Sequence, residues 1–87
     1  MSHTEAQALA NVRGYASAGR VRFSKHAWLR MYERNATEMD VLHALATAQS
    51  CRAAPEERWR VEGKDRDGDD LTVVVVLENG VLVVTLF

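Results

Sequence analysis

Three nitrogen-bearing side chains recur every four residues in one short segment of the chain, at His26, Arg30 and Arg34. The segment from Lys25 to Arg34 contains no Gly, Pro or β-branched residue, so we expect it to be helical. Side chains spaced by four residues project from nearly one face of a helix. The spacing therefore predicts a cationic row in which an imidazole, a candidate general base, lies beside two permanent positive charges.

This row has the parts needed for attack on a phosphodiester. An imidazole can move a proton, and guanidinium groups can hold a phosphate and stabilise the charge that develops on it. Arg22, just upstream, extends the positive patch. A structural interpretation stays open beside this one, because charged residues at this spacing are common on exposed helices, and His26 could instead bond a backbone carbonyl or support a cap at Ser24.

Other reactive side chains give weaker indications. The acidic turn over residues 65–70 is similar to a calcium loop, but Asp70 stands where that loop needs glycine and Val76 where it needs a bidentate glutamate. A solvated hairpin turn explains it better. His43 has no second ligand at a diagnostic spacing, and the lone Cys51 has no adjacent base. We therefore predict no metal site, no cofactor and no cysteine nucleophile.

The row needs a helix with a defined start, and Ser24 is a good N-cap for it. Two further helices are expected. Thr4 begins one that runs over about residues 5–17, and Thr37 begins one over about residues 38–49, where Asp40 completes a variant of the capping box. Three helices therefore lie in the first half of the chain.

The remaining segments are typical of strands. Residues 20–23 alternate polar and apolar side chains, which predicts a short strand, and residues 53–56 read as a loop that contains Pro55. Three strands follow in an antiparallel meander, over about residues 58–62, 71–78 and 81–87, with turn signals at Asp67-Gly68 and Asn79-Gly80.

The run from Val73 to Val76 puts apolar side chains on both faces of its strand, which predicts a sheet covered twice. Helices would cover one face, and the first helix or a second copy the other. The predicted fold is a single α+β domain over residues 1–87, with N-terminal helices packed on a C-terminal three- to four-stranded antiparallel sheet. Its parts are an N-terminal helix (1–19), a short strand with two helices (20–50) and the meander (56–87).

Composition fits this expectation. The 87 residues are 47% hydrophobic and 26% charged, the balance of an ordinary globular domain. No apolar run approaches the roughly 20 residues of a membrane span, no secretory signal is recognisable and a single cysteine fits a reducing compartment, so we expect a cytoplasmic protein. The net charge of −1 hides a segregation: residues 1–60 carry +3 and residues 61–87 carry −4.

The segment around the row also resembles a known family. Phe23-Ser24-Lys25-His26-Ala27, followed by Arg30-Met31 and Glu33-Arg34, is similar to the F-S-x-H-A-x-x-R-M-x-x-R-G-I signature of the small bacterial domain-of-unknown-function family 4258. The resemblance spans about residues 20–87 and includes the second helix, a D-x-D-G turn and the closing strand. Asn35-Ala36 stand where the signature has Gly-Ile.

This family in turn resembles the RelE-like and MqsR-like toxins, small α+β domains whose characterised relatives cleave messenger RNA without a metal and are held by an antitoxin. The resemblance implies a toxin-like, metal-independent endoribonuclease of a bacterial toxin–antitoxin system. His26 would act as base or acid, with Arg30 and Arg34 stabilising charge on the phosphate. RNA would be held by Arg22, Lys25 and Thr85, and the partners would be RNA and a cognate antitoxin.

A second hypothesis belongs to another class. The chain could be a non-catalytic, homodimeric protein-interaction module, in which the row is a salt-bridge surface or stabilises the fold. The apolar residues on both faces of the sheet favour this hypothesis, because a small monomer would have to hide them. Whether the protein is an enzyme stays open at the level of the sequence.

Overall fold

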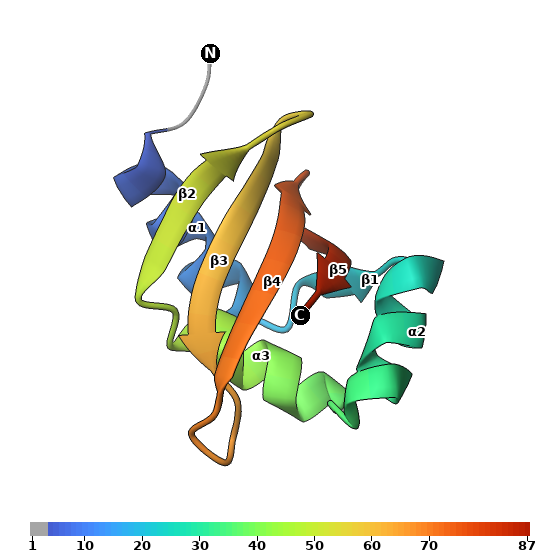
Figure 1. The fold of residues 1–87 in the computed structure, drawn as a ribbon. Helices are drawn as coiled ribbons and strands as arrows, with labels where there is room; N and C mark the ends of the chain where they lie inside the picture. Colours follow the sequence, from blue (N-terminus) through green and yellow to red (C-terminus); the bar gives the residue numbers. More distant parts are fainter. Residues whose placement is uncertain (1–3) are drawn as a thin grey trace.

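The computed structural model describes residues 4–87 and contains three helices and five strands, arranged as Figure 1 shows. In chain order these are α1 (Glu5–Ser17), β1 (Val21–Phe23), α2 (Lys25–Arg34), α3 (Glu38–Ala46), β2 (Ser50–Ala54), β3 (Arg58–Lys64), β4 (Asp70–Leu77) and β5 (Val81–Leu86). The α+β class and the C-terminal position of the main sheet are confirmed.

The five strands form one mixed sheet in the order β1-β5-β4-β3-β2. Strands β2 to β5 are an antiparallel meander, whereas β1 pairs in parallel with β5, from Val21 beside Val81 to Phe23 beside Val83. The prediction of a purely antiparallel sheet of three or four strands was therefore wrong. The chain leaves β1 through two helices and three strands before β5 returns beside it, and a parallel pair needs a long crossover connection of this kind.

The strand β2 is the element that sequence analysis missed. Its residues Ser50, Ala53 and Ala54 have low strand propensity, and no strand was predicted between the helix expected to end at about residue 49 and the loop expected over residues 53–56. Pairing with β3 overrides that weak preference. For the same reason α3 ends at Ala46 rather than near residue 49.

The helix starts were predicted correctly, because their caps are local. The hydroxyl of Ser24 accepts a hydrogen bond from the Ala27 N–H at 3.0 Å. Thr4 and Thr37 each make a full capping box, and in the second the Asp40 carboxylate accepts from the Thr37 N–H at 3.0 Å. These bonds satisfy donors that a helix start leaves free.

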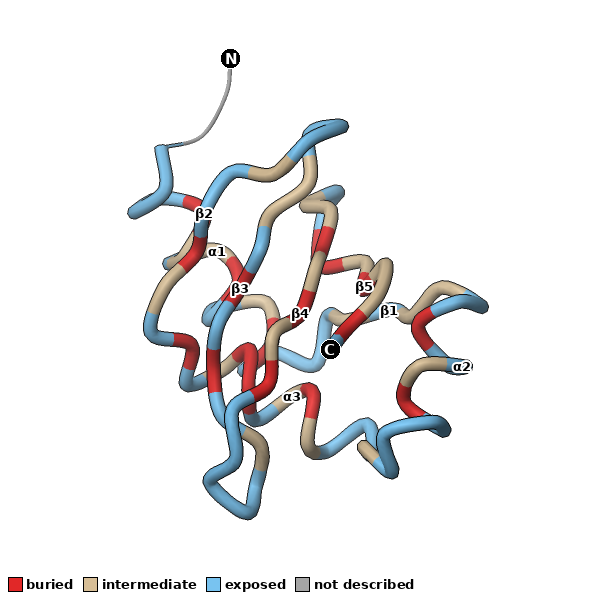
Figure 2. Tube along the Cα trace, in the orientation of Figure 1, coloured by how far each residue is buried: buried red, intermediate tan, exposed pale blue. Residues whose placement is uncertain are grey.

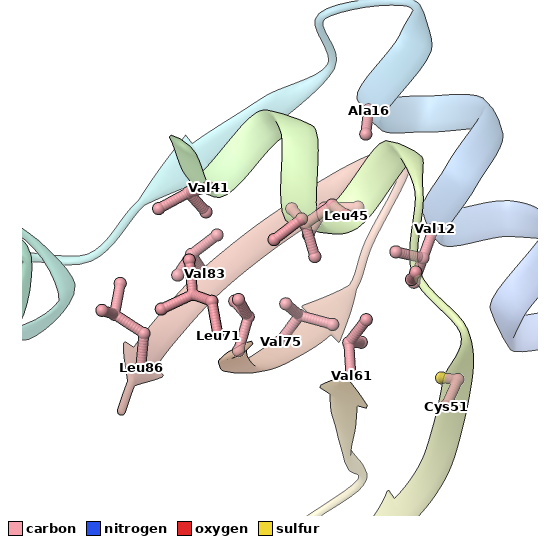
Figure 3. Packing of buried hydrophobic residues seen from close by; sticks show 14 of the residues in the cluster. Val12, Ala16, Val41, Leu45, Cys51, Val61, Leu71, Val75, Val83 and Leu86 are labelled. Atoms are coloured by element: carbon pink, nitrogen blue, oxygen red, sulfur yellow. The ribbon is translucent and has the colours of Figure 1, made fainter. Parts of the chain in front are cut away.

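Helices α1 and α3 cover one face of the sheet and enclose the core. Figure 3 shows Val12 of α1 and Leu45 of α3 converging with Val61, Val75 and Val83 of the sheet, and all five are fully buried. Two covers were expected for the second face, the first helix or a second copy, and the first of these was wrong, since α1 packs against α3 in the same layer. The opposite face carries no helix among the described residues, and we call it the open face.

Helix α3 lies unusually close to the sheet at Gly63. A Cβ atom at this position would lie 2.9 Å from the carbonyl carbon of Ala44, a distance that real side chains do not adopt. Glycine is therefore needed so that the α3 backbone can approach β3. No helix in residues 4–87 is long and apolar enough to cross a membrane.

Candidate functional site

Helix α2 covers the part of the β5 edge that β1 leaves open. Strand β1 ends at Phe23, and the next residue, Ser24, bonds twice to β5: its N–H donates to the Val83 carbonyl at 2.9 Å and its hydroxyl to the Val84 carbonyl at 2.8 Å. Arg30, one helical turn after His26, donates from its Nε to the Leu86 carbonyl at 3.2 Å. The start of α2 therefore satisfies acceptors that an exposed edge strand would leave free.

The structure places His26, Arg30 and Arg34 along one side of α2, as their spacing predicts. Their roles differ. Arg30 is tied to β5, and its Nη1 lies 3.5 Å from a Glu33 carboxylate oxygen, whereas the side chains of His26 and Arg34 are exposed and make no hydrogen bond or ion pair with residues 4–87. One member of the row thus stabilises the fold, and two remain available to a ligand.

Two hollows are lined by residues 4–87, and neither includes His26, Arg30 or Arg34. A groove of about 450 Å³ runs between α2 and α3, on the other side of α2, and is lined by Trp28, Met31, Tyr32, Ala36, Thr37, Glu38 and Met39. A polar hollow of about 350 Å³ lies beside the acidic turn, against Thr37, Asp40, Arg66 and Asp67. Neither hollow therefore brings a ligand to His26, and a surface beside the row is the alternative.

That surface is identified by the strand register. Val73 and Val75 of β4 are fully buried under the helices, so the alternate residues Val74 and Val76 point to the open face. Partners in register share a face. Three cross-strand rows of the open face follow from the pairing: Arg22, Leu82, Val76, Arg58 and Ala54; Thr85, Val74, Arg60 and Arg52; and Phe87, Thr72, Glu62 and Ser50.

The open face is cationic around an apolar middle. Four arginines, Arg22, Arg52, Arg58 and Arg60, lie on it beside the acidic Glu62. At the end next to the acidic turn, the face also carries Lys64 and Asp70, which form an ion pair at 2.6 Å. Figure 2 shows the alternation that produces it, with β4 changing between buried and half-buried residues along its length. The half-buried valines are the centre of this surface, and the arginines lie on both sides of them.

The four arginines are held loosely. Arg58 lies 3.3 Å from Glu56 and Arg60 lies 3.7 Å from Glu62, both as exposed pairs of little energetic weight. The Arg60 guanidinium also stands 5.0 Å from the centre of the Phe87 ring. Arg22 and Arg52 have no ion pair among the described residues. These cations can therefore turn to a ligand at small cost.

The candidate row and the open face lie toward the same side of the molecule. On α2, Trp28 projects away from the row and packs on Phe23, with ring centroids 5.0 Å apart. Phe23 pairs with the buried Val83 and so belongs to the covered face of the sheet. Because Trp28 lies toward the helix layer, His26 and Arg34 on the other side of α2 lie toward the open face.

Sequence analysis located part of this surface. Arg22 and Thr85, named as RNA-binding candidates, both lie on the open face, in the outer and middle rows. Lys25 does not join them, because helical spacing puts it on the side of α2 away from the row. Arg52, Arg58, Arg60 and Phe87 were missed. The alternation of arginines at residues 58 and 60 was the available signal. Only the strand register reveals that these arginines lie on the same face of the sheet as Arg22.

The remaining reactive side chains are either buried or close to backbone groups with which they can form hydrogen bonds. Cys51 is buried, and burial, with a smaller contribution from the Glu5 carboxylate, raises the pKa of its thiol to about 11. His43 Nδ1 lies 2.9 Å from the Lys64 carbonyl. The Asp65 carboxylate accepts from the N–H groups of Asp67 and Asp69 within its own turn. Within residues 4–87 no cluster of three or more His, Cys, Asp or Glu side chains is placed to hold a metal ion.

The sequence profile of one family, Domain of unknown function (DUF4258), matches residues 23–87, most of the chain. The chain belongs to the DUF4258 family. No curated protein and no solved structure matches it. In this DUF4258 member the matched region begins at the end of β1 and includes all of α2, so the contacts of Ser24 and Arg30 with β5 lie within the family segment.

Proposed function

We propose that this DUF4258 protein binds single-stranded RNA across the open face and cleaves it as a toxin-like endoribonuclease that needs no metal. The observation that carries the proposal is the set of four arginines on one exposed sheet face around half-buried valines and Phe87. Guanidinium groups neutralise phosphates, and an aromatic ring offers a surface on which a base can stack. A single strand fits this face because its bases are free to make such contacts.

Cleavage requires a proton-transfer group at the edge of the bound strand, and His26 is the candidate. In the proposed reaction the 2′-hydroxyl oxygen of one nucleotide bonds to the adjacent phosphorus, and the bond from phosphorus to the 5′-oxygen of the next nucleotide breaks. The products are a 2′,3′-cyclic phosphate and a 5′-hydroxyl. His26 takes the proton from the attacking hydroxyl or gives one to the leaving oxygen, and Arg34 stabilises charge on the phosphate.

RNA binding is tested with a fluorescent single-stranded oligonucleotide and fluorescence anisotropy. The double variant Arg52→Glu/Arg60→Glu should weaken binding by at least about tenfold, because two cations of the open face become repulsive. Arg66→Glu is the matched control, since Arg66 is exposed on the acidic turn and lines a hollow with Thr37 and Asp40 at the start of α3. Equal binding by wild type and the double variant would reject the open face as the RNA site.

Cleavage is tested separately on the same oligonucleotide. His26→Gln should reduce the rate by about 100-fold or more while binding is retained. An oligonucleotide with 2′-deoxy sugars should bind and stay intact. A metal chelator should not change the cleavage rate of the wild type or of His26→Gln. Binding without cleavage by the wild type would leave an RNA-binding protein and reject the ribonuclease.

The second candidate function, a protein-interaction module, is favoured by a different observation. Large apolar side chains are exposed on α2 and at the start of α3: Trp28 is 46%, Leu29 60%, Tyr32 83% and Met39 56% exposed. Such clusters mark contact surfaces. Induced expression in a bacterial host separates the two functions, because growth arrest with RNA decay supports the toxin and harmless accumulation supports the module.

A further inference from the structure

One side of α2 faces away from the rest of the molecule and carries exposed apolar side chains between charged ones. Leu29 and Tyr32 lie on this side, and Trp28 continues it toward the groove between α2 and α3. The buried residues of α2, Ala27 and Met31, lie on the opposite side. We call Lys25, Leu29, Tyr32 and Glu33 the outer stripe of α2. Its apolar members have no covering element among residues 4–87.

The charges of the outer stripe have a regular order. Lys25 lies one turn before Leu29 and Glu33 one turn after it, so a cation and an anion flank a central apolar side chain at equal distance. Reversing the direction of the helix exchanges the two charges. The stripe is therefore complementary to an antiparallel copy of itself.

The same charges are unfavourable within α2. A helix favours anions in its first turn and cations in its last. Yet α2 begins with Lys25, has no acidic residue in its first turn and carries Glu33 next to its end. Glu33 makes one exposed contact, with Arg30 at 3.5 Å, and Lys25 makes no ion pair with the described residues. An external partner that presents an anion to Lys25 and a cation to Glu33 would compensate for this arrangement.

We propose that the outer stripe is a homodimer interface, in which α2 packs antiparallel on α2 of a second copy about a two-fold axis at Leu29. Lys25 of each copy then faces Glu33 of the other, and Leu29 faces its equivalent. An isologous contact requires this kind of self-complementary surface. Antiparallel helix dipoles also attract one another. The copy would cover the neighbouring apolar surface at Trp28 and Tyr32, so a single contact accounts for both the charge order and the exposed apolar residues.

Oligomeric state is measured by sedimentation velocity over about 5 to 500 μM, a range that brackets micromolar dissociation constants. The wild type should be dimeric, and Leu29→Glu should weaken the dimer by at least about 30-fold, as loss of a central contact does. Helical circular dichroism should be unchanged, because Leu29 is exposed in the monomer. A monomeric wild type throughout this range, or a dimer that persists unchanged in Leu29→Glu, overturns the proposal.

A charge exchange tests the antiparallel register. Lys25→Glu alone and Glu33→Lys alone should each weaken self-association, because each homodimer then holds two repulsive pairs. A mixture of the two variants should form a heterodimer in which both pairs attract, and Lys25→Glu/Glu33→Lys in one chain should dimerise again. Arg66→Glu and Glu78→Lys are the matched controls, with the same charge changes at exposed turn positions. Failure of the mixture to associate overturns the register and with it the proposal.

This inference does not depend on RNA binding. The outer stripe shares no residue with the open face or with the cationic row. Leu29→Glu should therefore leave the affinity for the oligonucleotide unchanged within about twofold. Loss of dimerisation and loss of RNA binding are distinguishable results.

Discussion

Arg30 shows that a residue placed by its spacing among catalytic candidates can also serve the fold. Its Nε meets the Leu86 carbonyl, an acceptor on the β5 edge that β1 is too short to reach. Its neighbours in the row, His26 and Arg34, have no such contact with residues 4–87. Substituting Arg30 therefore tests stability as well as chemistry, whereas His26 tests chemistry alone.

Substitutions of Arg30 and His26 should differ in their effect on the free energy of unfolding. Arg30→Met should lower the free energy of unfolding by about 1 kcal/mol, because a partly buried carbonyl loses its donor. His26→Gln should leave it unchanged within about 0.5 kcal/mol, as is usual for exposed positions without contacts. Urea denaturation followed by circular dichroism measures both. An equal loss in the two variants would contradict the assignment of separate roles.

Cys51 gives a prediction about reactivity. Burial raises the pKa of its thiol to about 11, so at pH 8 the reactive thiolate is a very small fraction. We expect iodoacetamide to label the folded protein slowly at pH 8 and the urea-unfolded protein rapidly. Mass spectrometry after timed quenching measures the two rates. Rapid labelling of the folded protein would show that the thiol is accessible.

At the scale of elements, the start of α3 should respond to acid. The Thr37 N–H, followed by the N–H of Arg66, holds the pKa of the Asp40 carboxyl below its ordinary value of 3.8. A carboxyl with a lowered pKa stabilises the folded state above the unfolded pKa, and this contribution is lost as the pH falls through the folded pKa. Asp40→Ala should therefore cost about 1 kcal/mol at pH 7, typical of a lost cap, and progressively less below pH 3.8.

The control for this prediction is the pH dependence itself. Wild type and Asp40→Ala should converge in stability as the carboxyl becomes protonated, which thermal unfolding from pH 7 down to about pH 2 can follow. A difference that stays constant over the whole range would mean that the charge of Asp40 does not contribute.

The approach of α3 to β3 gives a second prediction for elements. Gly63→Ala should lower the free energy of unfolding by more than about 2 kcal/mol, because the added Cβ meets the backbone of Ala44 and α3 has to shift. Gly14→Ala is a suitable control, since a Cβ there meets nothing within 4 Å and should be neutral or stabilising. Equal stability of the two variants would contradict the close contact.

The elements that sequence analysis located are those with local signals. Ser24 and Thr37 fix helix starts through bonds to residues three positions away, and Asn79-Gly80 joins the last two strands. The parallel pairing of β1 with β5 joins residues about 60 positions apart, and no local pattern encodes it. The same limit applied to the site. Arg22 and Arg60 share a face only through the register of three strand pairs, so their common face could not be read from spacing.

At the scale of the whole molecule, the net charge of −1 says little about ligands. Four of the twelve acidic residues lie in residues 65–70, while four arginines lie on the open face. Attraction to a polyanion depends on the local field of the surface that it meets. A protein with a small negative total can therefore still hold a phosphate chain.

This distribution predicts the salt dependence of RNA binding. If the four arginines each neutralise about one phosphate, the logarithm of the association constant should fall with the logarithm of salt concentration with a slope of about −2 to −3. Anisotropy titrations at several salt concentrations measure it. Arg52→Glu/Arg60→Glu should make the slope shallower, and Arg66→Glu should leave it unchanged. A slope near zero would mean that phosphate contacts on this face do not drive binding.

Helix α2 stands at the β5 edge with one flank toward the arginine-bearing side and its outer stripe pointing outward. RNA binding at the open face and dimerisation through the outer stripe should therefore be independent. RNA could bind or dissociate while two protomers stay joined, and dissociation of the protomers would not need to release the RNA. If the open face binds RNA and the outer stripe joins two chains, a saturated dimer should hold two RNA strands.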